Sequence, residues 1–180
     1  TMDQIEVVGV PLEDASFRLS RLDDNVLEMP VGFCLNLLSM GELLQIQSAL
    51  SLYGLIDGAL PQTEGRDALL AQLAAILASE GYYARALAAC TDYARALARI
   101  LAERGGTSGS IVDVQRAFGE RNPGLYYYPA HRVLLRLGLA YPVDSATRPY
   151  YLLPEGLVDA VAAYERRAER QAAPAAVPAD

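Results

Sequence analysis

Three consecutive tyrosines, Tyr126, Tyr127 and Tyr128, and the single histidine, His131, are the side chains of this sequence best suited to binding or chemistry. Tyrosine rings can stack on nucleic-acid bases or anchor a protein interface. They can equally fill a core, so both interpretations stay open for this run. A metal site or a general base at His131 needs partners, and no Cys, Asp or Glu stands at ligand spacing from it. We therefore expect His131 to be solvated or to face a groove.

Motifs of nucleotide-binding and hydrolytic enzymes are missing from the sequence. The glycines near residues 105–109 do not follow the phosphate-loop spacing, and all 15 basic residues are arginine. No serine stands in a GxSxG motif. The acid pairs at 13–14 and 23–24 are typical of turns. We therefore expect a non-enzymatic protein with no cofactor and no metal.

Composition favours a folded protein of one domain or two small ones. The chain has 180 residues, of which 52% are hydrophobic, so a packed core is expected. Cys34 and Cys90 both lie in apolar helical patterns, which predicts buried free thiols and a reducing compartment. The N-terminus lacks a basic segment followed by an apolar core, so no secretory signal is expected. These features predict a cytoplasmic location.

The net charge of −7 is unevenly distributed along the chain. Residues 1–104 carry seven arginines and fourteen acids, which gives −7, whereas residues 105–171 carry eight arginines and seven acids, which gives +1. The first part would be repelled by nucleic acid, whereas the second could bind it through a local patch.

The first 60 residues predict a β-hairpin followed by a buried helical segment. Residues 4–12 have the composition of a strand, and residues 17–22 and 26–31 flank turn residues as further strands. From Gly32, leucines are too dense for one exposed face, which predicts a helix buried on most sides. The polar residues within 31–60 exclude a membrane span.

Residues 61–104 predict a helical hairpin. Glycine and proline in 54–65 indicate a loop, helical spacing follows at 67–79, and a second helix is expected over 82–104 before Gly105. Leucine, isoleucine and alanine form one stripe on these helices. The stripe predicts either a homodimer interface or packing of the two helices within one subunit.

Residues 105–170 predict further helices and a two-stranded hairpin. Ser110 can cap a helix over 111–118, and Pro129 suits the first turn of a helix that Gly138 ends. Two strands at 139–143 and 150–153 flank a polar turn, and a last helix reaches about residue 170. The Ala- and Pro-rich residues 171–180 predict a disordered tail.

The order helix, helix, helix, two-stranded hairpin, helix over residues 95–168 resembles the winged-helix domains of bacterial regulators. Residues 134–139 are similar to the end of their recognition helix, and residues 150–156 to the exit of their wing. The resemblance implies a C-terminal winged helix. Together with the N-terminal β-hairpin and the buried helical middle, it leads us to expect a mostly helical α+β fold.

The same resemblance implies the residues of a DNA-binding site. In that family the third helix enters the major groove and the wing touches phosphate or the minor groove. Carried onto this sequence, helix and wing would offer Arg121, Tyr128, His131, Arg132, Arg136, Ser145, Thr147 and Arg148.

The function implied is a DNA-binding transcription regulator that acts as a homodimer, with residues 67–104 forming the dimer interface. The alternative is a non-enzymatic adaptor or assembly subunit whose winged helix binds another protein. Charge on the third helix and the wing discriminates between the two, because binding to DNA phosphates needs a basic surface. Few arginines stand there, and Glu120 and Asp144 lie close by.

Overall fold

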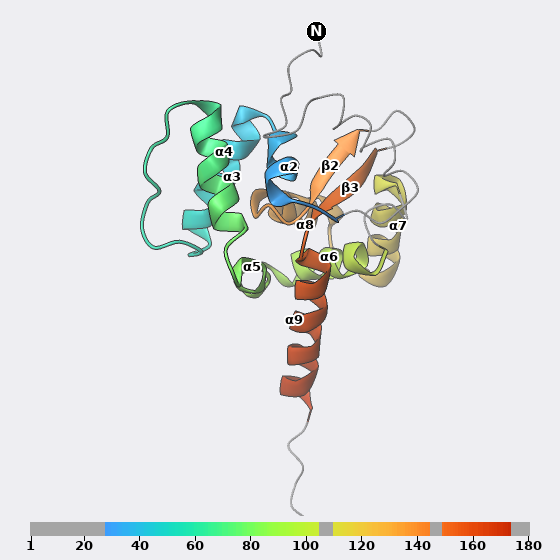
Figure 1. Ribbon diagram of the computed structural model, residues 1–180. Coiled ribbons are helices and arrows are strands. Elements are labelled where there is room, and N and C mark those ends of the chain that lie inside the picture. Colours follow the sequence, from blue (N-terminus) through green and yellow to red (C-terminus); the bar gives the residue numbers. More distant parts are fainter. Residues whose placement is uncertain (1–27, 105–109, 145–148, 174–180) are drawn as a thin grey trace, which may run out of the picture.

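The computed structural model describes residues 28–104, 110–144 and 149–173 of the chain (Figure 1). They form a mostly helical α+β fold, as the sequence predicts, with a small sheet among the helices. The elements in chain order are β1 (Glu28–Met29), α2 (Val31–Asn36), α3 (Met40–Leu52), α4 (Gly65–Leu77), α5 (Tyr82–Ala89), α6 (Asp92–Arg104), α7 (Ile111–Arg121), α8 (Tyr127–Arg136), β2 (Tyr141–Asp144), β3 (Pro149–Pro154) and α9 (Leu157–Ala172).

Local sequence fixes where two of the helices begin. At α3, the Ser39 hydroxyl accepts from the Glu42 amide at 3.2 Å and the Glu42 carboxylate accepts from the Ser39 amide at 3.0 Å. Ser110 and Asp113 form the same reciprocal cap at the start of α7. Each box satisfies two amides that have no partner inside the helix. The predicted cap at Ser110 is confirmed.

The predicted hairpin is confirmed, since β2 and β3 pair antiparallel with Tyr141 opposite Leu152. The N-terminal strands at 4–12 and 17–22 lie outside the described residues. Within the third predicted strand, β1 is present but pairs in parallel with β3, placing Glu28 opposite Leu153. The Glu28 carboxylate accepts from the Val158 amide at 3.1 Å, at the start of α9. Because a carboxylate is stabilised at a helix N-terminus, this contact favours the pairing of β1 with β3 in the C-terminal part of the chain.

One continuous core joins the described elements from β1 to α9. Cys34 and Cys90 are both buried in it as free thiols, as predicted. Among the described residues, no helix is long and apolar enough to cross a membrane.

The expectation that the segment after Gly32 is buried on most sides is wrong for α3. Leu43, Ile46 and Leu50 are buried, whereas Leu44 and Leu52 are 44% and 80% exposed. Only one face of α3 packs against α4 and α8, so the extra leucines meet solvent.

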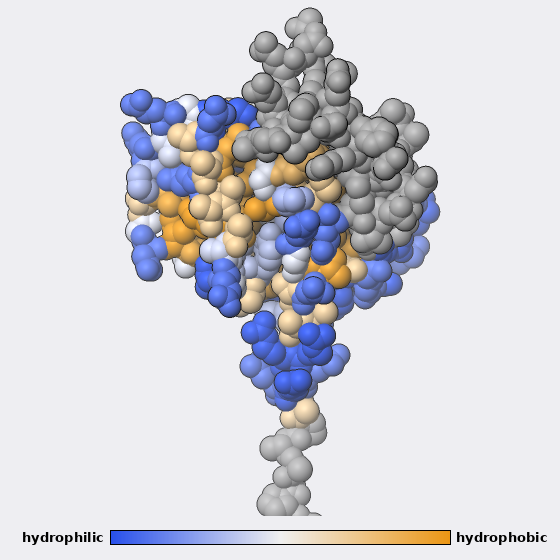
Figure 2. Space-filling model, in the orientation of Figure 1, coloured by the Kyte–Doolittle hydropathy of each residue, from blue (hydrophilic) through white to orange (hydrophobic). Residues whose placement is uncertain are grey.

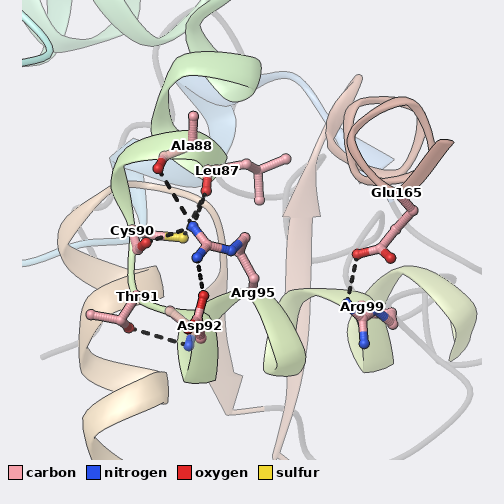
Figure 3. A network of polar contacts seen from close by, with 9 residues as sticks. Leu87, Ala88, Cys90, Thr91, Asp92, Arg95, Arg99 and Glu165 are labelled. Carbon is pink, nitrogen blue, oxygen red and sulfur yellow. Dashed lines mark hydrogen bonds and ion pairs between the residues drawn. The ribbon is translucent and has the colours of Figure 1, made fainter. Parts of the chain in front are cut away.

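The prediction of one helix over 82–104 is also wrong, because the chain breaks between α5 and α6. Cys90 is extended, and the Thr91 hydroxyl accepts from the Ala94 amide at 3.3 Å to start α6. Figure 3 shows the Arg95 guanidinium turned back onto the end of α5. It donates to the carbonyls of Leu87 at 2.8 Å and Cys90 at 2.7 Å. These carbonyls lack partners within α5, so Arg95 stabilises the break.

We expect Arg95→Ala to lower the free energy of unfolding by about 1–2 kcal/mol, because it removes charged hydrogen bonds at a half-buried helix end. The control is Arg99→Ala, which removes an exposed ion pair with Glu165 at 2.8 Å (Figure 3) and should cost about 0–1 kcal/mol. Urea unfolding of both variants measures the difference. Equal losses would show that the contacts of Arg95 with α5 contribute nothing specific.

The apolar stripe of residues 67–104 is buried within the chain. Leu73, Leu77, Leu97 and Ile100 are each at most 1% exposed in the single chain. The stripe is therefore covered inside one subunit, but α4 packs mainly on α2 and α3, and α6 on α8 and α9, rather than the two predicted helices on each other.

Candidate interaction surface on helix α8

Helix α8 has one buried face and one exposed face. Ala130, Val133 and Leu134 are buried, and the helix packs against α6 and α3. Tyr128, Arg132 and Arg136 are exposed and follow one another at intervals of four residues. Since side chains four residues apart share one face of a helix, these three form a single stripe.

Large apolar side chains extend the exposed stripe at its N-terminal end. Tyr126 is 80% exposed, Tyr128 65% and Leu125 44%. Tyr127, between the two tyrosines, is only 8% exposed and packs edge-on against Phe118. The core interpretation therefore holds for the middle ring, whereas the outer two rings are exposed. We call Leu125, Tyr126, Tyr128, Arg132 and Arg136 the α8 surface.

The placement of His131 differs from the expectation that it is solvated or faces a groove. Its ring is half-buried, and Nδ1 forms a hydrogen bond with the hydroxyl of Tyr151 on β3. The Tyr127 hydroxyl is hydrogen-bonded to the same Tyr151 hydroxyl. Tyr151 can thus donate to the neutral ring nitrogen while it accepts from Tyr127. The cluster connects α8 to the sheet, so His131 is a structural residue as much as a surface one.

His131 makes stability depend on pH. Burial, together with the nearby Arg132 charge, lowers the pKa of His131 below its ordinary value of 6.5. The unfolded chain therefore binds the proton more readily, and stability falls as the pH drops below about 6.5. We expect the urea midpoint to fall between pH 7.5 and pH 5.5, and to fall less in His131→Asn, which keeps an acceptor but does not titrate. The same pH dependence in both proteins would contradict this assignment.

The remaining predicted site residues differ in whether they form an ion pair and in whether the structure describes them. Arg121 is ion-paired with Glu103 of α6, so its charge is largely neutralised. Arg132 and Arg136 have no ion pair with any carboxylate that the structure describes. Ser145, Thr147 and Arg148 lie outside the described residues.

A second exposed apolar face lies on α3 and was missed from the sequence. Leu44 and Leu52 line an open groove on α3, and Arg136 of α8 lines it as well. The dense leucines of residues 43–52 are the sequence signal for this face, but such density predicts burial rather than exposure. Figure 2 shows apolar surface on the side of the molecule formed by α3 and α4, whereas the projecting end of α9 is mostly hydrophilic.

No group of three metal-ligating side chains occurs among residues 28–104, 110–144 and 149–173. Compared with known proteins, the chain matches no family model, no curated protein and no solved structure. Function therefore has to be argued from the surface itself.

Proposed function

We propose that this protein is a non-enzymatic adaptor or assembly subunit that binds another protein through the α8 surface. The observation that carries the proposal is the exposure of Tyr126 and Tyr128 beside the unpaired Arg132. Tyrosine and arginine are among the residue types most enriched in the energetic centres of protein interfaces.

The balance of charge favours a protein partner over DNA. Among the described arginines predicted to contact DNA, Arg121 is paired with Glu103, and only Arg132 and Arg136 remain without an ion pair. A DNA reader commonly neutralises roughly six to ten phosphates. The chain as a whole carries a net charge of −7, which opposes approach to a polyanion.

The packing of α8 on the core also supports binding through the α8 surface. Tyr127 and Val133 hold α8 on the core, so the exposed side chains are presented with little ordering cost. The sequence α6, α7, α8, hairpin and α9 is the order expected of a winged helix. We propose that residues 95–168 are such a domain and that its third helix, α8, grips the partner.

The test is capture of partners from the cells that make this chain, with tagged wild type, Tyr128→Ala and Arg132→Ala as baits. We expect at least one protein to be retained by wild type and lost with both variants, since hot-spot residues each contribute about 2 kcal/mol, roughly thirtyfold in affinity. The matched control is Arg166→Ala, an exposed arginine on α9, which should retain the partner. Retention of the same proteins by all four baits would refute the proposal.

DNA binding is the second candidate, favoured by one observation: Arg132 and Arg136 are both exposed and stand one turn apart on α8. If this helix reads a major groove, Arg132→Ala and Arg136→Ala should each weaken binding by about 1–3 kcal/mol. Arg148→Ala should weaken it uniformly across sequences, as loss of a phosphate contact does. Fluorescence anisotropy with genomic fragments measures this, and the absence of binding at about 50 mM salt would end the DNA hypothesis.

A further inference from the structure

We infer that the exposed face of α3 is a homodimer interface, in which two copies of α3 pack antiparallel about a two-fold axis. This inference does not depend on the proposed function of the α8 surface. It starts from the groove that Gly41, Leu44, Gln45, Ser48 and Leu52 line. A helix has 3.6 residues per turn, so Gly41 and Leu52 lie on one stripe about three turns apart, with Gln45 and Ser48 between them.

The α3 face is complementary in shape to its own copy. An antiparallel pair centred between residues 46 and 47 sets Leu52 of one copy opposite Gly41 of the other, at both ends of the contact. Gln45 then meets Ser48 in the middle, where the two can exchange hydrogen bonds. Leu52 is 80% exposed in the single chain, and Gly41 leaves the space that such a side chain needs. Large side chains opposite small ones allow two helices to approach closely.

Its charge also suits contact with an identical surface. In a two-fold contact every group meets its own symmetry equivalent, so like charges on the face would repel one another. The exposed residues of α3 (Met40, Gly41, Leu44, Gln45, Ser48, Ser51 and Leu52) are all neutral, in a chain of which 21% of residues are charged. Glu42, the only charged residue of α3, is held in the helix cap by the Ser39 amide at 3.0 Å.

The rim of the face carries one group of each sign. Arg136 of α8 lines both the groove and a small recess beside it, and Glu42 lines the recess as well. A second copy therefore meets an α3 face that is itself neutral, with Arg136 and Glu42 at its border. A partner of strongly acidic or strongly basic character would gain little from this face.

Sedimentation velocity on the full chain tests the dimer. We expect a mass of twice 19.4 kDa at about 100 μM. Leu52→Glu should raise the dissociation constant at least about tenfold, because it places a carboxylate in the apolar contact. Ala75→Glu makes the same charge change on an exposed site of α4 and should leave the dimer intact.

The antiparallel register gives a sharper test by mixing two variants. A Cβ added at Gly41 would meet no side chain of its own chain closer than Ser39 Oγ at 3.9 Å, so Gly41→Arg should fold normally but block Leu52 of the second copy. Leu52→Glu and Gly41→Arg should each be monomeric alone. Mixed together they should form a heterodimer, because the carboxylate introduced at position 52 of one chain meets the guanidinium introduced at position 41 of the other, while the second end keeps the native contact. A wild-type monomer at about 100 μM, a dimer unaffected by Leu52→Glu, or no recovery on mixing would each overturn the inference.

Discussion

Gly138→Ala is expected to lower the free energy of unfolding by about 3–5 kcal/mol, a large part of the stability of an ordinary domain. Gly138 follows α8 with φ at +68°, a left-handed conformation that side chains disfavour. A methyl group there would lie 2.4 Å from Leu77 Cδ2 and 2.9 Å from the Tyr141 hydroxyl. Both neighbours are buried, so neither can withdraw without opening the core.

The matched control is Gly119→Ala in α7, where a methyl group meets no atom within 4 Å. That change should leave stability unchanged or raise it by up to about 1 kcal/mol, because alanine favours the helix. The double variant Gly138→Ala with Leu77→Ala should lose less than the sum of the two single losses, since it removes the closest clash. Urea denaturation of the wild type and these four variants measures the losses. If the loss in the double variant equals the sum of the two single losses, the clash is not the cause.

Tyr151→Phe is expected to cost about 2–3 kcal/mol. The substitution keeps the ring but removes the hydroxyl that is hydrogen-bonded to both Tyr127 and His131. Two partly buried polar groups on α8 would lose their partner on β3, and each unsatisfied group carries a desolvation cost. Thermal unfolding measures the loss, and the dependence of stability on His131 protonation should change with it.

Tyr141→Phe provides the control on the neighbouring strand. The Tyr141 hydroxyl is fully buried and has no hydrogen-bond partner among the described residues. Its removal should be neutral or stabilising by up to about 1 kcal/mol, because a buried polar group without a partner costs free energy. Equal losses from Tyr141→Phe and Tyr151→Phe would contradict the role given to the Tyr127–His131–Tyr151 cluster.

Features controlled by neighbouring residues could be predicted from the sequence. The cap at Ser110 and the end of α8 near Gly138 each depend on capping or turn chemistry within a few positions, and the pairing of β2 with β3 joins strands that lie close together in the sequence. Hydrophobic periodicity located α4 for the same reason.

Features controlled by distant contacts could not be predicted. The break between α5 and α6 depends on Arg95, which a continuous helical pattern would place on the exposed face. The parallel pairing of β1 depends on β3, more than a hundred residues away in the chain. In the candidate site, Tyr128 and Arg132 are exposed at positions that the winged-helix resemblance placed outward, whereas the turn of His131 toward Tyr151 depends on a contact with β3 that local sequence does not reveal.

Hydroxyl-radical footprinting of the tyrosines tests most directly whether the α8 surface binds a partner. In the free protein, Tyr126 and Tyr128 should be modified readily and Tyr127, which is 8% exposed, should be protected as an internal reference. With the captured partner added in excess, we predict that Tyr126 and Tyr128 lose their reactivity while the exposed residues of α9 keep theirs. Undiminished modification of both tyrosines in the bound state would contradict the proposal that α8 contacts the partner.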